Sequence, residues 1–169
     1  SRMVYINYYL IGCELRLLGI NYNCAPVLDI RVREANEVIG SRSFSSDEVI
    51  VSELGKYACK GLRTSGIIPI IKHIPGHGRA KLDSHFALPD VDGLSKLFIK
   101  DIYPFKKNNN MPAAMTAHIK YLGIDSILPA TQSKIIIKDI IRKKIGFSGI
   151  LFSDDLCMRA LEGSFEEIT

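Results

Sequence analysis

The sequence has no tryptophan, only four cysteines among 169 residues, and no strong excess of either charge. It contains 22 lysines and arginines and 18 aspartates and glutamates, and the positive residues are interspersed rather than gathered in one block. This distribution gives no electrostatic signal for nucleic acid or an anionic membrane. The cysteines show no C-x-x-C spacing, which argues against a zinc site or a disulfide framework and for free thiols.

Long apolar segments are also missing. The longest, such as residues 67–71 and 135–137, are far shorter than the ~20 residues that a transmembrane helix needs. The amino-terminal residues lack the basic and then apolar layout of a signal peptide. We therefore expect residues 1–169 to form a single soluble, cytoplasmic domain without membrane or nucleic-acid partners.

Four short apolar segments predict buried strands. They lack the polar–apolar alternation of a half-exposed strand, which favours a parallel sheet covered on both faces. The predicted strands are residues 23–28, 67–71, 113–117 and 149–153. In parallel α/β folds functional groups gather where strands end. The ionisable or imidazole residues that follow these four strands are Asp29, Lys72, His73, His118, Asp154 and Asp155.

An amphipathic pattern predicts a helix between the first two strands. Ser46 stands in the position of an N-cap, with Asp47 after it, and Gly66 lies just beyond the expected end. We expect the buried side of this helix to contain Val49, Ile50, Leu54, Ala58 and Leu62.

Two further helices are predicted downstream. Ser133 is expected to cap a helix over residues 134–145, which has isoleucines on its inner side and is stopped by Gly146. A shorter helix around residues 94–103 is expected to end before Pro104, because proline has no backbone N–H. Strands and helices thus alternate along the chain, which predicts repeated βα units.

Three of the four histidines lie within thirteen residues, in a loop with the sequence KHIPGHG at 72–78 and DSH at 83–85. Asp83, two residues before His85, can place a carboxylate against one imidazole nitrogen, fixing the tautomer and raising the basicity of the other nitrogen. That arrangement suits acid/base catalysis. Metal binding through His73, His77 and His85 is an alternative, as is a solvated loop without chemistry.

Two adjacent carboxylates end the fourth predicted strand. Because side chains alternate along a strand, Asp154 and Asp155 are expected to point in different directions. We assign Asp154 to chemistry, with Lys72 and Arg42 favouring its ionised form. Asp155 is assigned to capping the turn that follows it.

These motifs, in this order, resemble family 3 glycoside hydrolases, specifically the β-N-acetylhexosaminidase branch. The resemblance covers about residues 12–161. The segments that carry it are KHIPGHG at 72–78, DSH at 83–85, MTAH at 115–118 and FSDDLCM at 152–158, with APVLD at 25–29 and GSRSF at 40–44.

The resemblance implies a retaining hydrolase. Asp154 would be the nucleophile that forms a covalent glycosyl-enzyme with a terminal N-acetylglucosamine. His85, oriented by Asp83, would protonate the leaving oxygen and then activate water, where most glycosidases use a second carboxylate.

The resemblance also implies a ligand and its binding residues. Arg42, Lys72 and His73 would bind the sugar, and the substrate would be a peptidoglycan fragment that contains N-acetylglucosamine and is processed in the cytoplasm during cell-wall recycling. It implies no metal and no organic cofactor.

The fold class expected from the resemblance is α/β, a partial TIM (β/α)₈ barrel. A complete barrel typically takes ~250 residues, and this chain matches about four βα units, the fourth to the seventh, without the first three strands and the last. Such a sheet has two exposed edges, at which we expect self-association. The alternative function is a truncated, catalytically silent barrel remnant that binds sugar or needs a partner chain.

Overall fold

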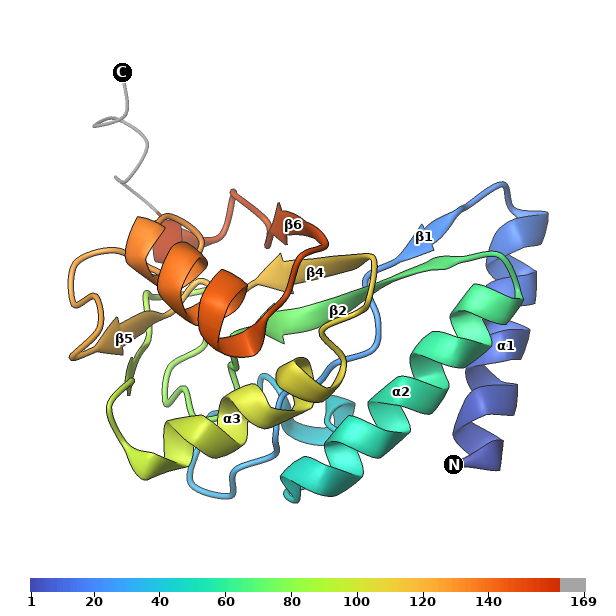
Figure 1. The fold of residues 1–169 in the computed structure, drawn as a ribbon. Coiled ribbons are helices and arrows are strands. Elements are labelled where there is room, and N and C mark those ends of the chain that lie inside the picture. The colour runs from blue at the N-terminus through green and yellow to red at the C-terminus, as the bar shows by residue number, and fades with distance from the viewer. Residues whose placement is uncertain (162–169) are drawn as a thin grey trace.

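A four-stranded parallel sheet organises the computed structural model of the chain, which describes residues 1–161 (Figure 1). In spatial order the strands are β1 (Tyr22–Asn23), β2 (Ile68–Ile74), β4 (Ala113–Thr116) and β6 (Ile150–Ser153). All neighbouring strands pair in parallel. The parallel sheet predicted from the sequence is confirmed.

Four helices form a second layer against one face of the sheet. They are α1 (Arg2–Leu17), α2 (Glu48–Thr64), α3 (Lys96–Lys107) and η2 (Ile136–Ile145). Each packs against the next helix along the chain, so that strands and helices follow the same order in both layers (Figure 1). This is the βα repetition expected from the sequence. Two single turns, η1 (Gly40–Arg42) and η3 (Arg159–Leu161), complete the helical elements of the described residues.

The strands differ in detail from the prediction. Residues 23–28 were expected to form one strand, but β1 covers only Tyr22 and Asn23. Pro26 has no N–H to donate, and the ladder resumes where the Lys72 N–H donates to the Pro26 carbonyl (3.1 Å) and the Leu28 N–H donates to the Lys72 carbonyl (2.7 Å). A second parallel pair, β3 (Asp90–Asp92) with β5 (Lys120–Leu122), was not predicted, because each strand has only three residues.

Helix α2 begins one residue later than expected, and its buried face agrees with the prediction only in part. Asp47, not Ser46, is its N-cap, since one carboxylate oxygen accepts from the N–H groups of the helix's second and third residues at 2.8 and 3.0 Å. Val49 and Ile50 are about half exposed rather than buried. Ala58 and Leu62 are buried as expected, and the other buried residues of the helix are Val51, Ser52, Gly55, Cys59 and Gly61.

Helix α3 continues through Pro104 to Lys107, so the predicted stop before the proline is wrong. Burial explains the extra turn, because Phe105 is fully buried and leaves water only if the helix continues. Asn108, just beyond the end of α3, is also buried, and its side-chain amide donates to the carbonyls of Pro104 (2.9 Å) and of Ser52 in α2 (3.1 Å). Helix η2 agrees with the prediction. The Ser133 hydroxyl oxygen accepts from the Ile136 N–H (3.1 Å) at its start, and Gly146 follows its last residue.

The core lies between the sheet and the helices. Its fully buried large side chains include Leu28, Leu62, Ile71, Phe98, Phe105, Tyr121, Ile136 and Phe147. By contrast, apolar side chains remain exposed at both outer strands of the sheet, where Tyr22 is 56% and Ile150 is 64% exposed. Within residues 1–161, β1 and β6 pair with one neighbouring strand each, so both edges of this sheet are open there.

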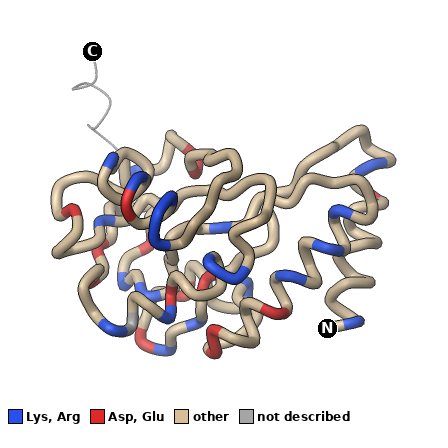
Figure 2. The backbone as a smooth tube through the Cα atoms, in the orientation of Figure 1, with Lys and Arg blue, Asp and Glu red and all other residues tan. Residues whose placement is uncertain are grey.

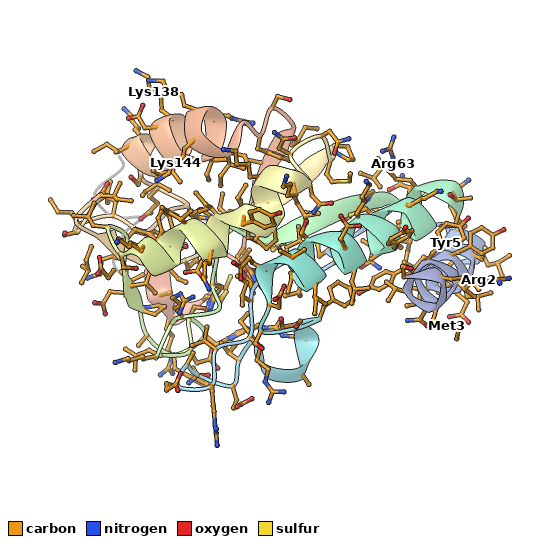
Figure 3. All side chains as sticks on the ribbon, turned by 60° about the horizontal axis from the view of Figure 1, so that its bottom comes forward. Arg2, Met3, Tyr5, Arg63, Lys138 and Lys144 are labelled. Atoms are coloured by element: carbon orange, nitrogen blue, oxygen red, sulfur yellow. The ribbon has the colours of Figure 1, made fainter. Side chains whose placement is uncertain are left out.

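Positions of both charges are distributed along the backbone rather than gathered in one region (Figure 2). Arg2 on α1, Arg63 on α2 and Lys138 on η2 extend outward from the helical layer (Figure 3). Within the described residues no helix is long and apolar enough to span a membrane.

Exchange of the α2 cap gives a first test of the fold. Asp47→Ala removes the acceptor of two N–H groups and is expected to lower the free energy of unfolding by about 1 kcal/mol. Ser46→Ala is the matched control, because its side chain is exposed, and it is expected to change little. Urea denaturation measures both, and an equal or larger loss in Ser46→Ala would contradict the assignment of the cap.

Candidate active site

The candidate active site lies at the carboxyl end of the parallel sheet, where the residues that follow its strands meet. Asp29 follows the short first strand, His73 lies near the end of β2, and Asp154 follows β6. The His73 side chain contacts both carboxylates, although 44 and 81 positions separate it from them along the chain. Parallel pairing brings them together, because it places the carboxyl ends of all strands at one edge.

A buried carboxylate holds His73 against Asp154. Asp29 Oδ2 lies 2.6 Å from His73 Nδ1, and the other ring nitrogen, Nε2, lies 3.7 Å from Asp154 Oδ2. Asp29 also accepts from the backbone N–H groups of His73 (3.1 Å) and His77 (2.7 Å). One inaccessible carboxylate therefore fixes two histidine-bearing segments of the loop after β2.

The hydrogen bonds decide the charge of Asp29. Burial by itself would raise the pKa of this carboxyl, but His73 and the His77 N–H stabilise the ionised form more strongly. The pKa of Asp29 therefore lies below its ordinary value, and the buried group is a carboxylate at neutral pH.

Asp154 and its neighbour Asp155 have different partners. Asp154 Oδ1 accepts from the Asp155 N–H (2.9 Å), and its Oδ2 faces His73. Asp155 Oδ1 accepts from the Cys157 N–H (2.9 Å), which is the turn-capping contact expected from the sequence. The Asp155 carbonyl lies 3.0 Å from Nε2 of His118 at the end of β4. The turn after β6 is thus tied to the neighbouring strand while the Asp154 side chain, 21% exposed, borders solvent.

The contact expected between Asp83 and His85 is present. Asp83 Oδ1 accepts from the His85 N–H (2.9 Å) and lies 2.7 Å from His85 Nδ1. Slight burial would raise the pKa of Asp83, but these two bonds outweigh it and the pKa is lowered. The His85 side chain is 57% exposed, and its Nε2 has no hydrogen bond within residues 1–161. That nitrogen is available to a bound ligand.

One of the predicted site residues, Arg42, is held within its own loop. The guanidinium of Arg42 donates to the Val38 carbonyl of its own loop (Nε–O 2.9 Å), and neither it nor Lys72 forms an ion pair with Asp154 in the described part of the chain. Among the described residues, His73 is the basic side chain within 4 Å of Asp154. The sequence could not predict this contact, because only the folded sheet shows which basic side chain faces the carboxylate.

The histidines do not converge as a metal site. His73 is directed at Asp29 and Asp154, His77 at Ser84, and His85 at Asp83. No group of three or more His, Cys, Asp or Glu side chains with metal-binding geometry occurs among residues 1–161.

Sequence reasoning gave three of these residues no role in the proposed chemistry. Asp29 was noted only as a residue that follows a strand, and His77 only as a possible metal ligand. Ser84 gave no signal of its own. The side chains of His77 and Ser84 meet at 3.1 Å in the buried interior of the loop.

Comparison with known proteins identifies the family. Residues 4–167 match the glycosyl hydrolase family 3 N-terminal domain, and the chain belongs to this family. It is 38% identical over 155 residues to a beta-hexosaminidase of Hydrogenovibrio crunogenus and 40% identical over 155 residues to one of Alkalilimnicola ehrlichii. Each alignment covers 90% of this chain but only 43% and 44%, respectively, of the relative. The chain thus spans less than half the length of these proteins.

Solved structures show the same fold. A family 3 beta-N-acetylglucosaminidase from Paenibacillus superimposes with a TM-score of 0.90 at 37% identity, covering 95% of this chain and 31% of the other. NagZ from Neisseria gonorrhoeae, in complex with N-trifluoroacetyl-D-glucosamine, superimposes with a TM-score of 0.85 at 37% identity, covering 95% and 47%. Both contain this chain's sheet and helices within a larger structure.

Loss of the Asp29 carboxylate tests its place at the centre of the site. Asp29→Asn replaces an acceptor-only group by a neutral amide and leaves buried donors unpaired, so the free energy of unfolding at pH 7 is expected to fall by about 3 kcal/mol. Asp90→Asn, at an exposed carboxylate on β3, is the control and is expected to have no such effect.

The same variant has a pH signature. Because folding lowers the pKa of Asp29, its stabilisation is complete above the ordinary pKa of Asp and is lost as the pH falls below about 4. Urea titrations across acid pH should therefore show a smaller loss of stability in Asp29→Asn than in the native sequence. An identical acid dependence would contradict the lowered pKa.

Proposed function

We propose that this chain carries the catalytic residues of a retaining β-N-acetylhexosaminidase. The observation that supports the proposal most is one network at the carboxyl end of the sheet, which runs from Asp154 through His73, Asp29 and His77 to the loop of Asp83 and His85. It connects an accessible carboxylate with an imidazole that is oriented by a second carboxylate. Double displacement at a glycosidic carbon needs these two groups.

In the proposed first step, Asp154 attacks the anomeric carbon of a terminal N-acetylglucosamine. A bond forms between its carboxylate oxygen and that carbon while the glycosidic C–O bond breaks. His85 gives the proton of Nε2 to the departing oxygen. Asp83, bound to Nδ1, keeps the imidazole in the orientation and tautomer that this transfer needs.

In the second step, the roles of His85 reverse. Its neutral Nε2 takes a proton from water, the water oxygen bonds to the anomeric carbon, and the ester bond to Asp154 breaks with its electron pair returning to the carboxylate. Two displacements restore the β configuration, so the hydrolase is a retaining one.

The proposed ligand is a saccharide that ends in N-acetylglucosamine, bound by Arg42, Lys72 and His73. The names of the similar proteins and the N-trifluoroacetyl-D-glucosamine bound in one similar structure support this substrate class. We assign a peptidoglycan-derived muropeptide fragment as the physiological substrate, processed in the cytoplasm during cell-wall recycling. The reaction scheme uses no metal and no organic cofactor.

The sheet corresponds, in this proposal, to the fourth to seventh βα units of a (β/α)₈ barrel, and residues 1–169 form one catalytic domain. The strand order, the single row of helices and the apolar edge residues support this assignment. The open edges also favour a second candidate function, a silent barrel remnant that binds sugar or works only with a partner chain. Self-association through these edges is expected in either case.

Removal of the proposed nucleophile separates the two candidates. Asp154→Ala is expected to reduce release of a chromophore from an N-acetyl-β-glucosaminide by at least about 10³-fold, because no covalent intermediate can form. Asp155→Asn is the matched control, since the neighbouring carboxylate caps a turn and its amide oxygen can still accept from Cys157.

Turnover by the native sequence, compared with the two variants, distinguishes the hydrolase from the silent remnant. Turnover that Asp154→Ala abolishes and Asp155→Asn keeps supports the hydrolase, and a β-anomeric first product in NMR spectra supports retention. Absence of turnover in the native chain, with saccharide binding seen by calorimetry, would overturn the hydrolase in favour of the silent remnant.

The acid/base pair has its own test. Asp83→Asn replaces the carboxylate that holds His85 Nδ1, and a loss of about 10²-fold in kcat is expected at neutral pH. Asp90→Asn, an exposed carboxylate near the same loop, is expected to stay within about twofold. Equal activity of the two variants in steady-state kinetics would remove Asp83 from the mechanism.

A further inference from the structure

His77 is a buried histidine that the proposed reaction does not use. Its ring is almost inaccessible, with Nε2 3.1 Å from the Ser84 hydroxyl oxygen and Nδ1 without a hydrogen bond partner within residues 1–161. The ring packs edge-on against His73 at a centroid distance of 5.4 Å, and the His77 N–H donates to Asp29. It therefore lies between the group that faces the proposed nucleophile and the loop of the proposed acid/base.

The surroundings of His77 define its protonation. Burial lowers its pKa, and the nearby Asp29 and Asp154 only partly oppose this, so the ring is neutral at pH 7. A neutral imidazole has one N–H. On Nδ1 this N–H would be buried without an acceptor, which is less favourable than a hydrogen bond from Nε2 to the Ser84 hydroxyl. The proton therefore belongs on Nε2, where it donates to the Ser84 hydroxyl oxygen.

Ser84 is the fixed point of an otherwise exposed segment. It stands between Asp83 and His85 and is only 2% exposed, whereas the His85 side chain is 57% exposed and Phe86 is 72% exposed. Its hydroxyl binds His77, and its carbonyl accepts from the Ala160 N–H (3.3 Å). The contact with His77 is thus the side-chain attachment of this segment to the interior.

We propose that His77 is a positioning residue that holds the Asp83–His85 pair over the site through the Ser84 hydroxyl. This inference rests on the proposed hydrolase function, because it assigns the purpose of the attachment to acid/base transfer. A displacement of about 1 Å of a transferring group can cost 10²-fold in rate. One buried hydrogen bond can therefore matter for turnover much more than for stability.

Ser84→Ala tests the attachment in the chain of residues 1–169, because it removes the hydroxyl and leaves Asp83 and His85 in place. We expect kcat on an N-acetyl-β-glucosaminide to fall about 10- to 100-fold, and KM to fall with it where breakdown of the glycosyl-enzyme limits turnover. Ser84→Thr restores a hydroxyl and is expected to recover most of the activity. Ser133→Ala is the matched control, because it also deletes a buried, hydrogen-bonded serine hydroxyl, at the start of η2, and is expected to keep native turnover.

Azide provides a readout that a purely structural role would not move. Azide attacks the glycosyl-enzyme without general base help, forming a C–N bond as the ester to Asp154 breaks, and it yields a glycosyl azide. It should therefore accelerate Ser84→Ala when breakdown of the intermediate limits turnover, as with an activated aryl leaving group, and have little effect on the native protein. A rate in Ser84→Ala within twofold of native, or a slow rate that azide does not raise, would overturn the inference.

Activity of the native protein separates this inference from the proposed function, and hydrogen exchange tests the attachment without reference to activity. An inactive native protein would overturn the hydrolase assignment, whereas an active one with an unaffected Ser84→Ala variant would overturn only the role of His77. Independently of activity, amide exchange in residues 80–88 is expected to increase in Ser84→Ala and not in Ser133→Ala. Unchanged exchange there would show that the His77–Ser84 contact does not hold the loop.

Discussion

The site depends on the buried, ionised carboxylate of Asp29. A charge away from water is tolerated only when hydrogen bonds replace its hydration, and here the donors are the backbone and ring of His73 and the backbone of His77. Satisfying this single group fixes both histidines at once. One ring is then directed at Asp154 and the other at Ser84, so a requirement of solvation becomes the geometry of the site.

The parallel sheet provides the frame in which this carboxylate acts. Its four strands bring their carboxyl ends to one edge. The helices α2, α3 and η2 cover one face of the sheet. Around the site the rigid parts are internal and the chemically useful atoms are accessible, as His85 Nε2 and Asp154 illustrate. Membership in glycosyl hydrolase family 3 agrees with this arrangement.

The open edges of the sheet affect every functional proposal. The beta-hexosaminidases that match this chain are more than twice as long as the aligned part, and apolar residues such as Tyr22 and Ile150 remain exposed at the two outer strands. The proposed nucleophile and acid/base pair nevertheless all come from the described residues. Whether this chain turns over substrate alone therefore depends on how well an open sheet keeps the network around Asp29 in place.

The sequence by itself determined the features that arise from neighbouring residues. The four apolar segments predicted the parallel strands, and a spacing of two residues predicted the contact of Asp83 with His85. Local patterns were less decisive where packing competes, as at the α2 cap, where Asp47 replaced Ser46, and in α3, which runs through Pro104 because Phe105 becomes buried.

Only the tertiary structure decided the rest of the site. The links of Asp29 to His73 and of His73 to Asp154 join residues that are far apart in the chain, and Arg42, expected beside Asp154, is bound to its own loop. Such contacts follow from strand register and from the need to satisfy a buried charge. Neither is encoded in the spacing of residues along one segment, which is why the sequence could name the groups but not their partners.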